Sequence, residues 1–98
     1  MTTTLPTQEQ VDRIAAELAP DVVRIRMDVT EDWAGEPAIY FRVILSDEAG
    51  KLVRTGEITR RVKSAVKDGL GIESLDHHAY FRWRSVSEQA TMQGSLWE

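Results

Sequence analysis

The sequence predicts an α+β fold, a two-layer sandwich in which two helices cover one face of a three-stranded β-sheet. Two kinds of apolar periodicity support this prediction. Two segments repeat apolar residues every three to four positions, as a helix with one buried face does, and three segments repeat them every second position, as half-buried strands do. Their order along the chain is helix, strand, strand, helix, strand. Only an arrangement with both helices on the same side of the sheet buries all five apolar faces.

The first helix is predicted to begin at Thr7, because Thr7 and Gln10 have the spacing of a capping box. Pro20 ends the helix, since proline cannot continue the helical hydrogen bonds. Between them, one apolar stripe is formed by Val11, Ile14, Ala15 and Leu18.

Three segments alternate as strands do, over Val22–Val29, from about Ala38 to Leu45, and from about His78 onward. The positions expected to face the helices are Val23, Ile25, Met27, Val29, Ile39, Phe41, Val43, Leu45, Ala79, Phe81, Trp83 and Ser85. The turn-rich segment 30–37 predicts an antiparallel hairpin between the first two strands. The third strand follows a helical crossover, which favours a parallel pairing with one of them.

The second helix is predicted to start near Ser46, where Ser46-Asp-Glu offers a cap and acidic residues in the first turn. Its apolar stripe consists of Leu52, Ile58, Val62, Ala65 and Val66. Gly50 and Gly56 each weaken a helix by roughly 1 kcal/mol relative to alanine, so the start can be displaced or broken. The helix is expected to end near Asp68, with Gly69 as the C-terminal cap, followed by a loop with two apolar anchors over residues 70–76.

The chain of 98 residues is expected to form a single domain, residues 1–98, with residues 1–6 flexible. The tail, residues 88–98, has no clear period, and a short helix, a docked strand and a disordered segment remain open. Trp97 in this tail is either an exposed anchor for a partner or, as we favour, a plug against the first helix.

Composition excludes several classes of protein. Hydrophobic residues make up 42% and charged residues 29% of the chain, which suits a folded globule. The absence of cysteine excludes a disulfide scaffold, thiol catalysis and thiolate zinc sites. No signal-like or membrane-spanning apolar stretch occurs, so we expect a cytoplasmic protein without membrane association. The net charge of −4 argues against a surface that is basic overall, but it leaves room for a local basic face.

Five of the nine arginines fall at alternate strand positions that point away from the helices, interleaved with two tyrosines. The set is Arg24, Arg26, Tyr40, Arg42, Tyr80, Arg82 and Arg84. The simplest interpretation is the ordinary polar face of a small open sheet. The alternatives are a binding face for a protein partner or for a second copy of the chain, because Arg and Tyr are enriched at interfaces, and a nucleic-acid-binding face.

Other clusters of polar residues predict no chemistry. His77 and His78 are adjacent on a strand, so their rings point to opposite sides and cannot converge on a metal. The acidic loop around Trp33, with Glu31, Asp32 and Glu36, matches no calcium loop, and we expect Trp33 to fold back on the core. Ser85, Ser87 and Glu88 lack the framing of a nucleophile. We therefore predict no catalytic residue, no metal site, no cofactor and no small-molecule substrate.

Three segments carry a resemblance to known proteins, Asp21–Arg26, Glu31–Glu48 and Tyr80–Gln89, which together with their surroundings cover about three quarters of the chain. They look like a group of small bacterial proteins with no known activity, which implies a bacterial cytosolic origin. The element order, with Ile25–Val29 and Ala38–Val43 flanking an acidic turn, is also similar to ribosome-binding factor A and KH-like domains. That likeness implies a second central helix and a small-residue turn facing RNA, which only Gly69-Leu-Gly71 approximates here.

Taken together, these features predict a non-enzymatic, acidic accessory module, antitoxin-like in size, that engages a protein partner or itself through the Arg/Tyr positions. The alternative is a KH-like RNA-binding module that uses the same positions.

Overall fold

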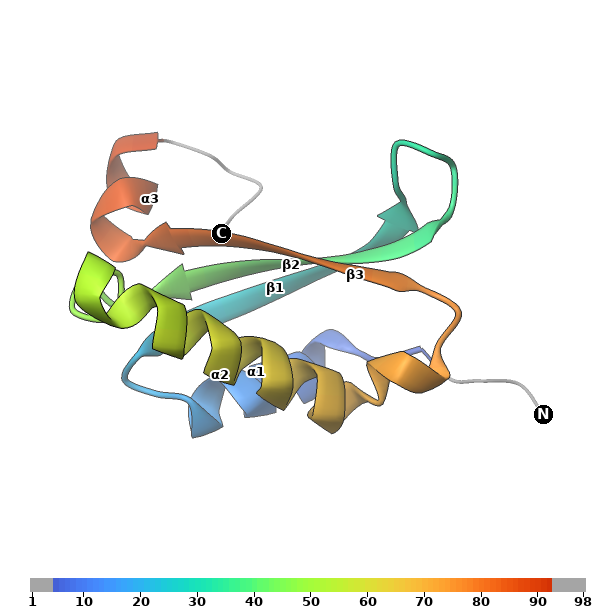
Figure 1. Cartoon of the computed structure of the whole chain (residues 1–98), viewed down its shortest axis with the longest axis horizontal. Helices are drawn as coiled ribbons and strands as arrows, with labels where there is room; N and C mark the ends of the chain where they lie inside the picture. The colour runs from blue at the N-terminus through green and yellow to red at the C-terminus, as the bar shows by residue number, and fades with distance from the viewer. Residues whose placement is uncertain (1–4, 93–98) are drawn as a thin grey trace.

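The computed structural model describes residues 5–92 and leaves out the side chains of residues 52–55 and 92. It contains three α-helices, one short 3-10 helix and a three-stranded sheet, which confirms the predicted α+β class (Figure 1). The elements in chain order are α1 (Gln8–Glu17), β1 (Val22–Glu31), β2 (Pro37–Leu45), α2 (Leu52–Leu70), η1 (Ile72–Ser74), β3 (His78–Ser85) and α3 (Val86–Met92).

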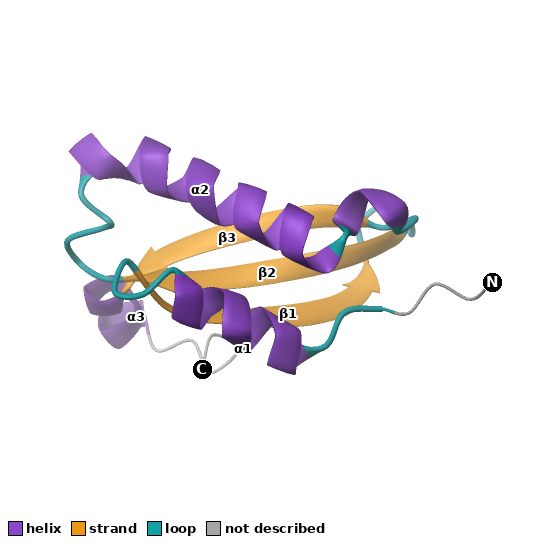
Figure 2. Ribbon diagram, turned by 90° about the horizontal axis from the view of Figure 1, so that it is seen from below, coloured by secondary structure: helices purple, strands orange, loops and turns teal. Residues whose placement is uncertain are grey.

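The sheet has the strand order β1-β2-β3. β1 and β2 form the predicted antiparallel hairpin, and β3 lies parallel to β2, as expected for a strand reached through a helical crossover. Helices α1 and α2 cover one face of the sheet side by side (Figure 2). α3 lies on the opposite face, at the end where β2 and β3 finish (Figure 1).

The core lies between the sheet and the helix pair α1 and α2. The largest fully buried side chains come from all three parts of this sandwich, and they are Phe41, Ile25, Ile39, Ile58, Val11, Val43, Val62 and Val66. All of these occupy positions that the two apolar periods assign to the interior. Burying one such side chain contributes roughly 1.5–3 kcal/mol, so this layer supplies most of the driving force for folding.

Two valines of β1 do not reach the core, contrary to prediction. The pairing of β1 with β2 shifts register between Val22 and Arg24, and this irregularity turns Val22 into the core while Val23 is 55% exposed. Val29 is also exposed, because it sits on an edge strand close to the hairpin end. A two-residue alternation in sequence cannot reveal an extra residue inserted in the strand.

The ends of α2 differ from their predicted positions. Ser46 caps a separate turn, in which its Oγ accepts a hydrogen bond from the Ala49 N–H at 3.1 Å, and the helix itself starts six residues later at Leu52. At the other end the left-handed cap is Gly71, with φ +62°, and not Gly69. Gly69 is a helical residue that faces α1, where an added Cβ would come within 2.8 Å of Ile14 Cδ1.

α1 begins as predicted, since Thr7 and Gln10 form a complete capping box. Residues 1–4, part of the segment expected to be flexible, lie outside the described residues, whereas Pro6 is buried. In the tail, residues 86–92 form α3, and residues 93–98, with Trp97, lie outside the described residues.

None of the helices within residues 5–92 is both long enough and apolar enough to cross a membrane.

Candidate functional site

The strand register places the predicted Arg/Tyr positions on one face of the sheet, in rows that run across the strands. Arg26, Arg42 and Arg82 lie directly abreast in one row. The next row toward the hairpin contains Asp28, Tyr40 and Tyr80, and the row toward α3 contains Arg24, Ile44 and Arg84. We call this surface the Arg/Tyr face, defined by Arg24, Arg26, Tyr40, Arg42, Tyr80, Arg82 and Arg84.

Arg42 and Arg84 of this face are bound to side chains of neighbouring elements. Arg42, whose side chain is only 14% exposed, donates to the Asp28 carboxylate on the neighbouring strand. Arg84 donates to Gln89 Oε1 in α3 at 3.1 Å. Asp28 is the single carboxylate among the strand positions of these three rows, against five guanidinium groups, so the centre of the face carries a net positive charge.

The Nε atoms of Arg26 and Arg42 are buried and have no hydrogen-bond partner among the described residues. A buried donor without an acceptor is unfavourable by about 1–3 kcal/mol. This unfavourable burial makes the centre of the row a place where charge does not stabilise the fold.

Part of this face is covered, contrary to the expectation that it lies open. Ile44 and Ala38, which share it, are both buried. α3 contacts β2 and β3 from this side, at the end that carries Arg24 and Arg84. The exposed part of the Arg/Tyr face is therefore limited to the middle of the sheet. There Arg82 is the exposed member of the row that it forms with Arg26 and Arg42.

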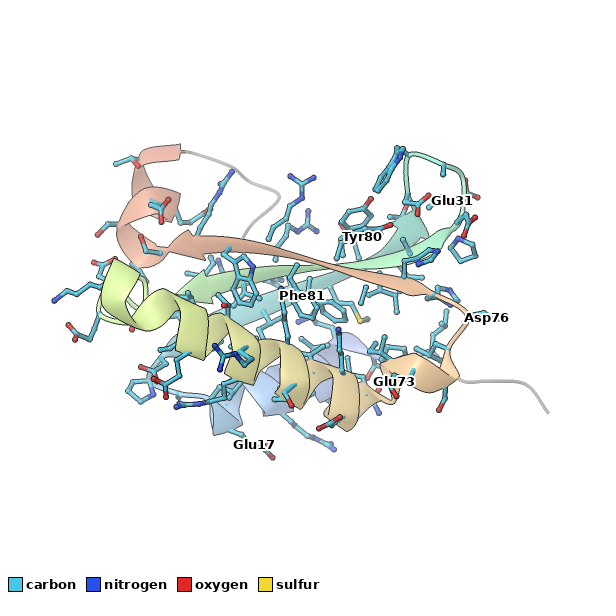
Figure 3. The ribbon with its side chains drawn as sticks, in the orientation of Figure 1. Glu17, Glu31, Glu73, Asp76, Tyr80 and Phe81 are labelled. Carbon is cyan, nitrogen blue, oxygen red and sulfur yellow. The ribbon has the colours of Figure 1, made fainter. Side chains whose placement is uncertain are left out.

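An aromatic cluster borders the basic centre. The rings of Tyr40 and Tyr80 stack with centroids 5.1 Å apart, and Trp33 in the hairpin loop leans on Tyr80 with centroids 5.6 Å apart. Trp33 is 83% exposed, so the prediction that it folds back on the core is wrong. Figure 3 shows Tyr80 on the loop side of the sheet and Phe81 on the helix side.

The loop that carries Trp33 is organised by Asp32. Its Oδ1 accepts hydrogen bonds from the backbone N–H groups of Ala34 and Glu36 at 2.9 and 3.0 Å, and its Oδ2 accepts one from the Tyr80 hydroxyl at 3.0 Å. These donors, the Glu36 N–H above all, hold the pKa of Asp32 below its ordinary value of 3.8. Desolvation and the bond to Asp32 raise the pKa of Tyr80.

Of the two histidines only His78 belongs to β3, whereas the prediction placed both on the strand. His78 Nε2 lies 2.8 Å from Glu36 Oε2, and this hydrogen bond raises the pKa of His78 above its ordinary value of 6.5. His77 precedes β3 and lies beside the same loop end. The described part of the chain contains no group of three or more His, Cys, Asp or Glu residues that could hold a metal ion.

Ser85, Ser87 and Glu88 serve as helix caps. The Ser85 N–H donates to Glu88 Oε1 and the Glu88 N–H donates to Ser85 Oγ, which is a capping box at the start of α3. Asp47 accepts from both the N–H and the hydroxyl of Ser87, at 3.0 and 2.6 Å, and these bonds lower the pKa of Asp47. The S-x-x-E spacing could have revealed this helix start in the sequence.

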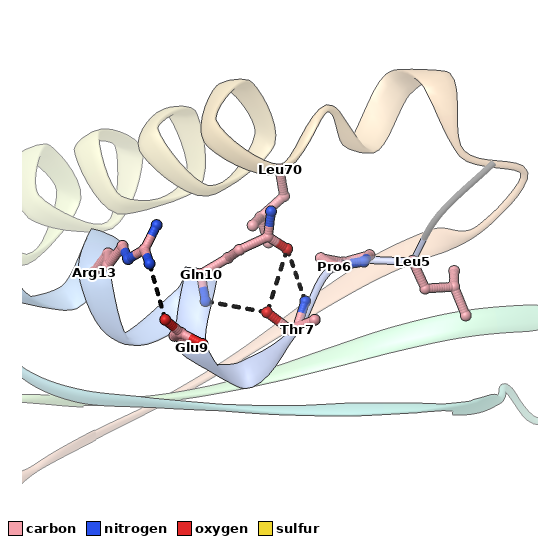
Figure 4. Close-up of a pocket in the computed structure, with 7 residues that line it drawn as sticks. All are labelled: Leu5, Pro6, Thr7, Glu9, Gln10, Arg13 and Leu70. Carbon is pink, nitrogen blue, oxygen red and sulfur yellow. Dashed lines mark hydrogen bonds and ion pairs between the residues drawn. The ribbon is translucent and has the colours of Figure 1, made fainter.

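A hollow of about 340 Å³ lies far from the Arg/Tyr face, where the start of α1 meets the end of α2 (Figure 4). Its lining includes Leu5, Pro6 and Leu70. Its polar side chains are already paired, in the Thr7–Gln10 capping box and in the Arg13–Glu9 ion pair at 2.8 Å. We therefore take the Arg/Tyr face, and not this hollow, as the candidate site.

The site includes two residues that sequence reasoning left out of it, Trp33 and Asp28. Asp28 shares the alternation of Arg24 and Arg26, so strand period alone could have found it. Trp33 could not be found in this way, because a loop has no period that fixes where its side chains point.

The fold and the face define a small α+β domain with an arginine-rich sheet surface bordered by aromatic rings. Comparisons with protein-family models, curated proteins and solved structures found no match for this chain. The small-residue turn implied by the KH-like resemblance is not formed by Gly69-Leu-Gly71, because Gly69 and Leu70 belong to α2 and Gly69 faces Ile14.

Proposed function

We propose that this chain is a non-enzymatic binding module of the cytoplasm, which uses the Arg/Tyr face to hold an acidic segment of a protein partner. The observation that carries this proposal is the register that sets Arg26, Arg42 and Arg82 abreast with one nearby carboxylate, Asp28. Guanidinium groups form paired, directional hydrogen bonds with carboxylates, and the Arg82 side chain in this row is exposed.

The aromatic border favours a protein partner over RNA. Recognition of single-stranded RNA relies on open aromatic faces against which bases stack. The Tyr80 ring already contacts three other rings, those of Tyr40, Trp33 and His78. Both tyrosine side chains are partly buried, which leaves Trp33 as the exposed ring of the aromatic cluster. The net charge of −4 also weakens the general attraction to phosphates on which RNA affinity depends.

The test is a fluorescence anisotropy titration with a labelled peptide of eight glutamates at low ionic strength. We expect saturable binding that Arg82→Gln weakens by about 3- to 10-fold, because one exposed charge-assisted contact is lost. Arg13→Gln is the matched control, since it removes the same charge from α1 in the opposite layer. The affinity of the Arg13→Gln variant for the peptide should stay within about twofold of that of the unaltered protein.

Two results would overturn the proposal. One is the absence of binding by any acidic peptide, and the other is an equal loss in the Arg82→Gln and Arg13→Gln variants, which would mean attraction without a site. A single-stranded RNA octamer that binds more tightly than the peptide, and depends on Arg82, would replace it by the RNA alternative.

A further inference from the structure

We infer that the partner segment adds to the outer edge of β3 as an extended strand, in which acidic and apolar side chains alternate. This inference deepens the proposed function and rests on it, since it states where an acidic segment lies and what pattern it has. The observation behind it is a difference between the two edges of the sheet.

The middle of the β1 edge is covered by a side chain of α1. The side-chain amide of Gln8 in α1 donates to the Ile25 carbonyl oxygen at 2.7 Å and accepts from the Met27 N–H at 3.0 Å. One carboxamide thus satisfies the same two backbone groups that a neighbouring strand would bind. An unpaired strand edge is a template for pairing with another chain, and Gln8 removes part of that template on this side.

The edge of β3 has no such cover within the described residues. The Ser85 N–H points away from β2, since it donates to Glu88 of α3 at 3.1 Å. Backbone N–H and C=O groups alternate direction along a strand, so those of Ala79, Phe81 and Trp83 point the same way. The described residues contain no strand beyond β3 to receive them.

The side chains at this edge differ on the two faces of the sheet. On the helix side, the rings of Phe81 and Trp83 stack with centroids 5.7 Å apart and are only partly buried. Lys63 Nζ lies 6.0 Å from the Phe81 ring centroid. An added strand would place every second side chain beside these rings, where an apolar residue buries the most surface.

On the other face, the same added strand would meet the basic centre. Arg82 is exposed on β3 and lies in the row of Arg26 and Arg42. The remaining side chains of the added strand would lie within reach of this row, and carboxylates match its charge. A second copy of the chain fits less well, because antiparallel pairing of two β3 edges brings like-charged arginines near each other.

The test uses an eight-residue peptide of alternating valine and glutamate, with blocked ends, and two isomers in which every second backbone nitrogen is methylated. One isomer carries the methyl groups on the valine nitrogens and the other on the glutamate nitrogens. An added strand turns one set of N–H groups toward β3 and the other set toward solvent. We expect one isomer to bind as the parent does and the other to lose about 10-fold or more, since several backbone hydrogen bonds disappear.

Amide hydrogen exchange supplies the second measurement. The parent peptide should slow exchange at the outward N–H groups of Ala79, Phe81 and Trp83, while the β1 edge is unchanged. The isomer that loses affinity also shows the direction of the added strand. Reversing the strand, with valine still on the helix side, exchanges the N–H groups that point toward β3 with those that point toward solvent.

Equal binding by both methylated isomers would overturn the inference. The proposed function would survive that result as long as Arg82→Gln still weakened binding of the glutamate peptide. Slow exchange at the same three amides in a dimer without peptide would overturn the inference in favour of self-association. Slow exchange caused by RNA instead of peptide would overturn both.

Discussion

Gly56, inside α2, and Gly71, the C-terminal cap of α2, have different physical roles. Gly71 caps the helix with φ +62°, a conformation that disfavours any residue with a Cβ, whereas Gly56 lies inside the helix with open space around it. We expect Gly71→Ala to lower the free energy of unfolding by about 1 kcal/mol. Gly56→Ala should raise it by up to about 1 kcal/mol, because alanine stabilises a helix interior.

Urea denaturation of the two variants measures both values. The pair is its own control, since both substitutions add one methyl group and neither meets an atom within 4 Å. Equal effects of the same sign would mean that the positive φ of Gly71 has no energetic weight.

The His78–Glu36 contact makes the hairpin loop sensitive to pH. The pKa of His78 is raised in the folded protein, so the contact contributes its full stability below the unfolded pKa near 6.5. That contribution disappears as pH rises through the folded pKa. We expect an NMR titration of the His78 ring to show a pKa above 6.5, and Glu36→Gln to bring it down. An unchanged His78 pKa in that variant would contradict the contact, and the His77 ring in the same spectrum serves as the internal control.

α3 is held at its start by polar contacts. It has seven residues, too few for a stable isolated helix, and its N-terminus is bound by Ser85, Glu88 and Asp47. We expect Asp47→Ala to speed amide exchange over residues 86–91 and to leave β1 and β2 unaffected. Asp76→Ala is the matched control, as Asp76 is an exposed acid near the opposite end of β3.

The pKa of Asp47 gives the same prediction a pH dependence. Because this pKa is lowered in the folded protein, the contact is fully formed above the ordinary value of 3.8 and is lost as pH falls through the folded pKa. Exchange over residues 86–91 should therefore rise in acid before the core opens. If protection from exchange were lost at the same pH in residues 86–91 and in the core, α3 and the core would unfold as one unit.

The elements that periodicity predicts well are those whose apolar stripe meets the core. Ile25, Phe41 and Val66 are buried as their positions require, and the bounds of β2 and the start of β3 agree with prediction within one residue. The differences arise where hydrogen bonds outside the stripe decide the structure. Ser46 has the sequence of a helix cap, yet it caps a turn, and its neighbour Asp47 caps a helix forty residues later in the chain.

At the scale of the whole molecule, the Arg/Tyr face could be predicted from strand alternation. Alternate residues of each strand lie on one face, and when three strands pair in register these faces form one surface. Arg26, Arg42 and Arg82 had only to lie on the same side, and the β1-β2-β3 order then set them abreast. The covering of this face by α3 could not be predicted, since the tail has no periodicity. The position of Trp33 was equally hidden, because the Asp32 turn and Tyr80 determine it through contacts that are distant in sequence.

The division of the molecule into a core layer and a charged face predicts opposite responses to substitution. Phe41→Ala should lower the free energy of unfolding by about 3–5 kcal/mol, because it leaves a cavity in the fully buried layer. Arg82→Gln should leave it unchanged or raise it by up to about 1 kcal/mol, since like charges abreast on neighbouring strands repel. Denaturation midpoints in low salt measure both changes in the free energy of unfolding. Arg13→Gln is the control, since it also removes one positive charge. A surface kept for binding carries charge that does not stabilise the fold, so a clear loss of stability in Arg82→Gln would mean that the arginine row is structural.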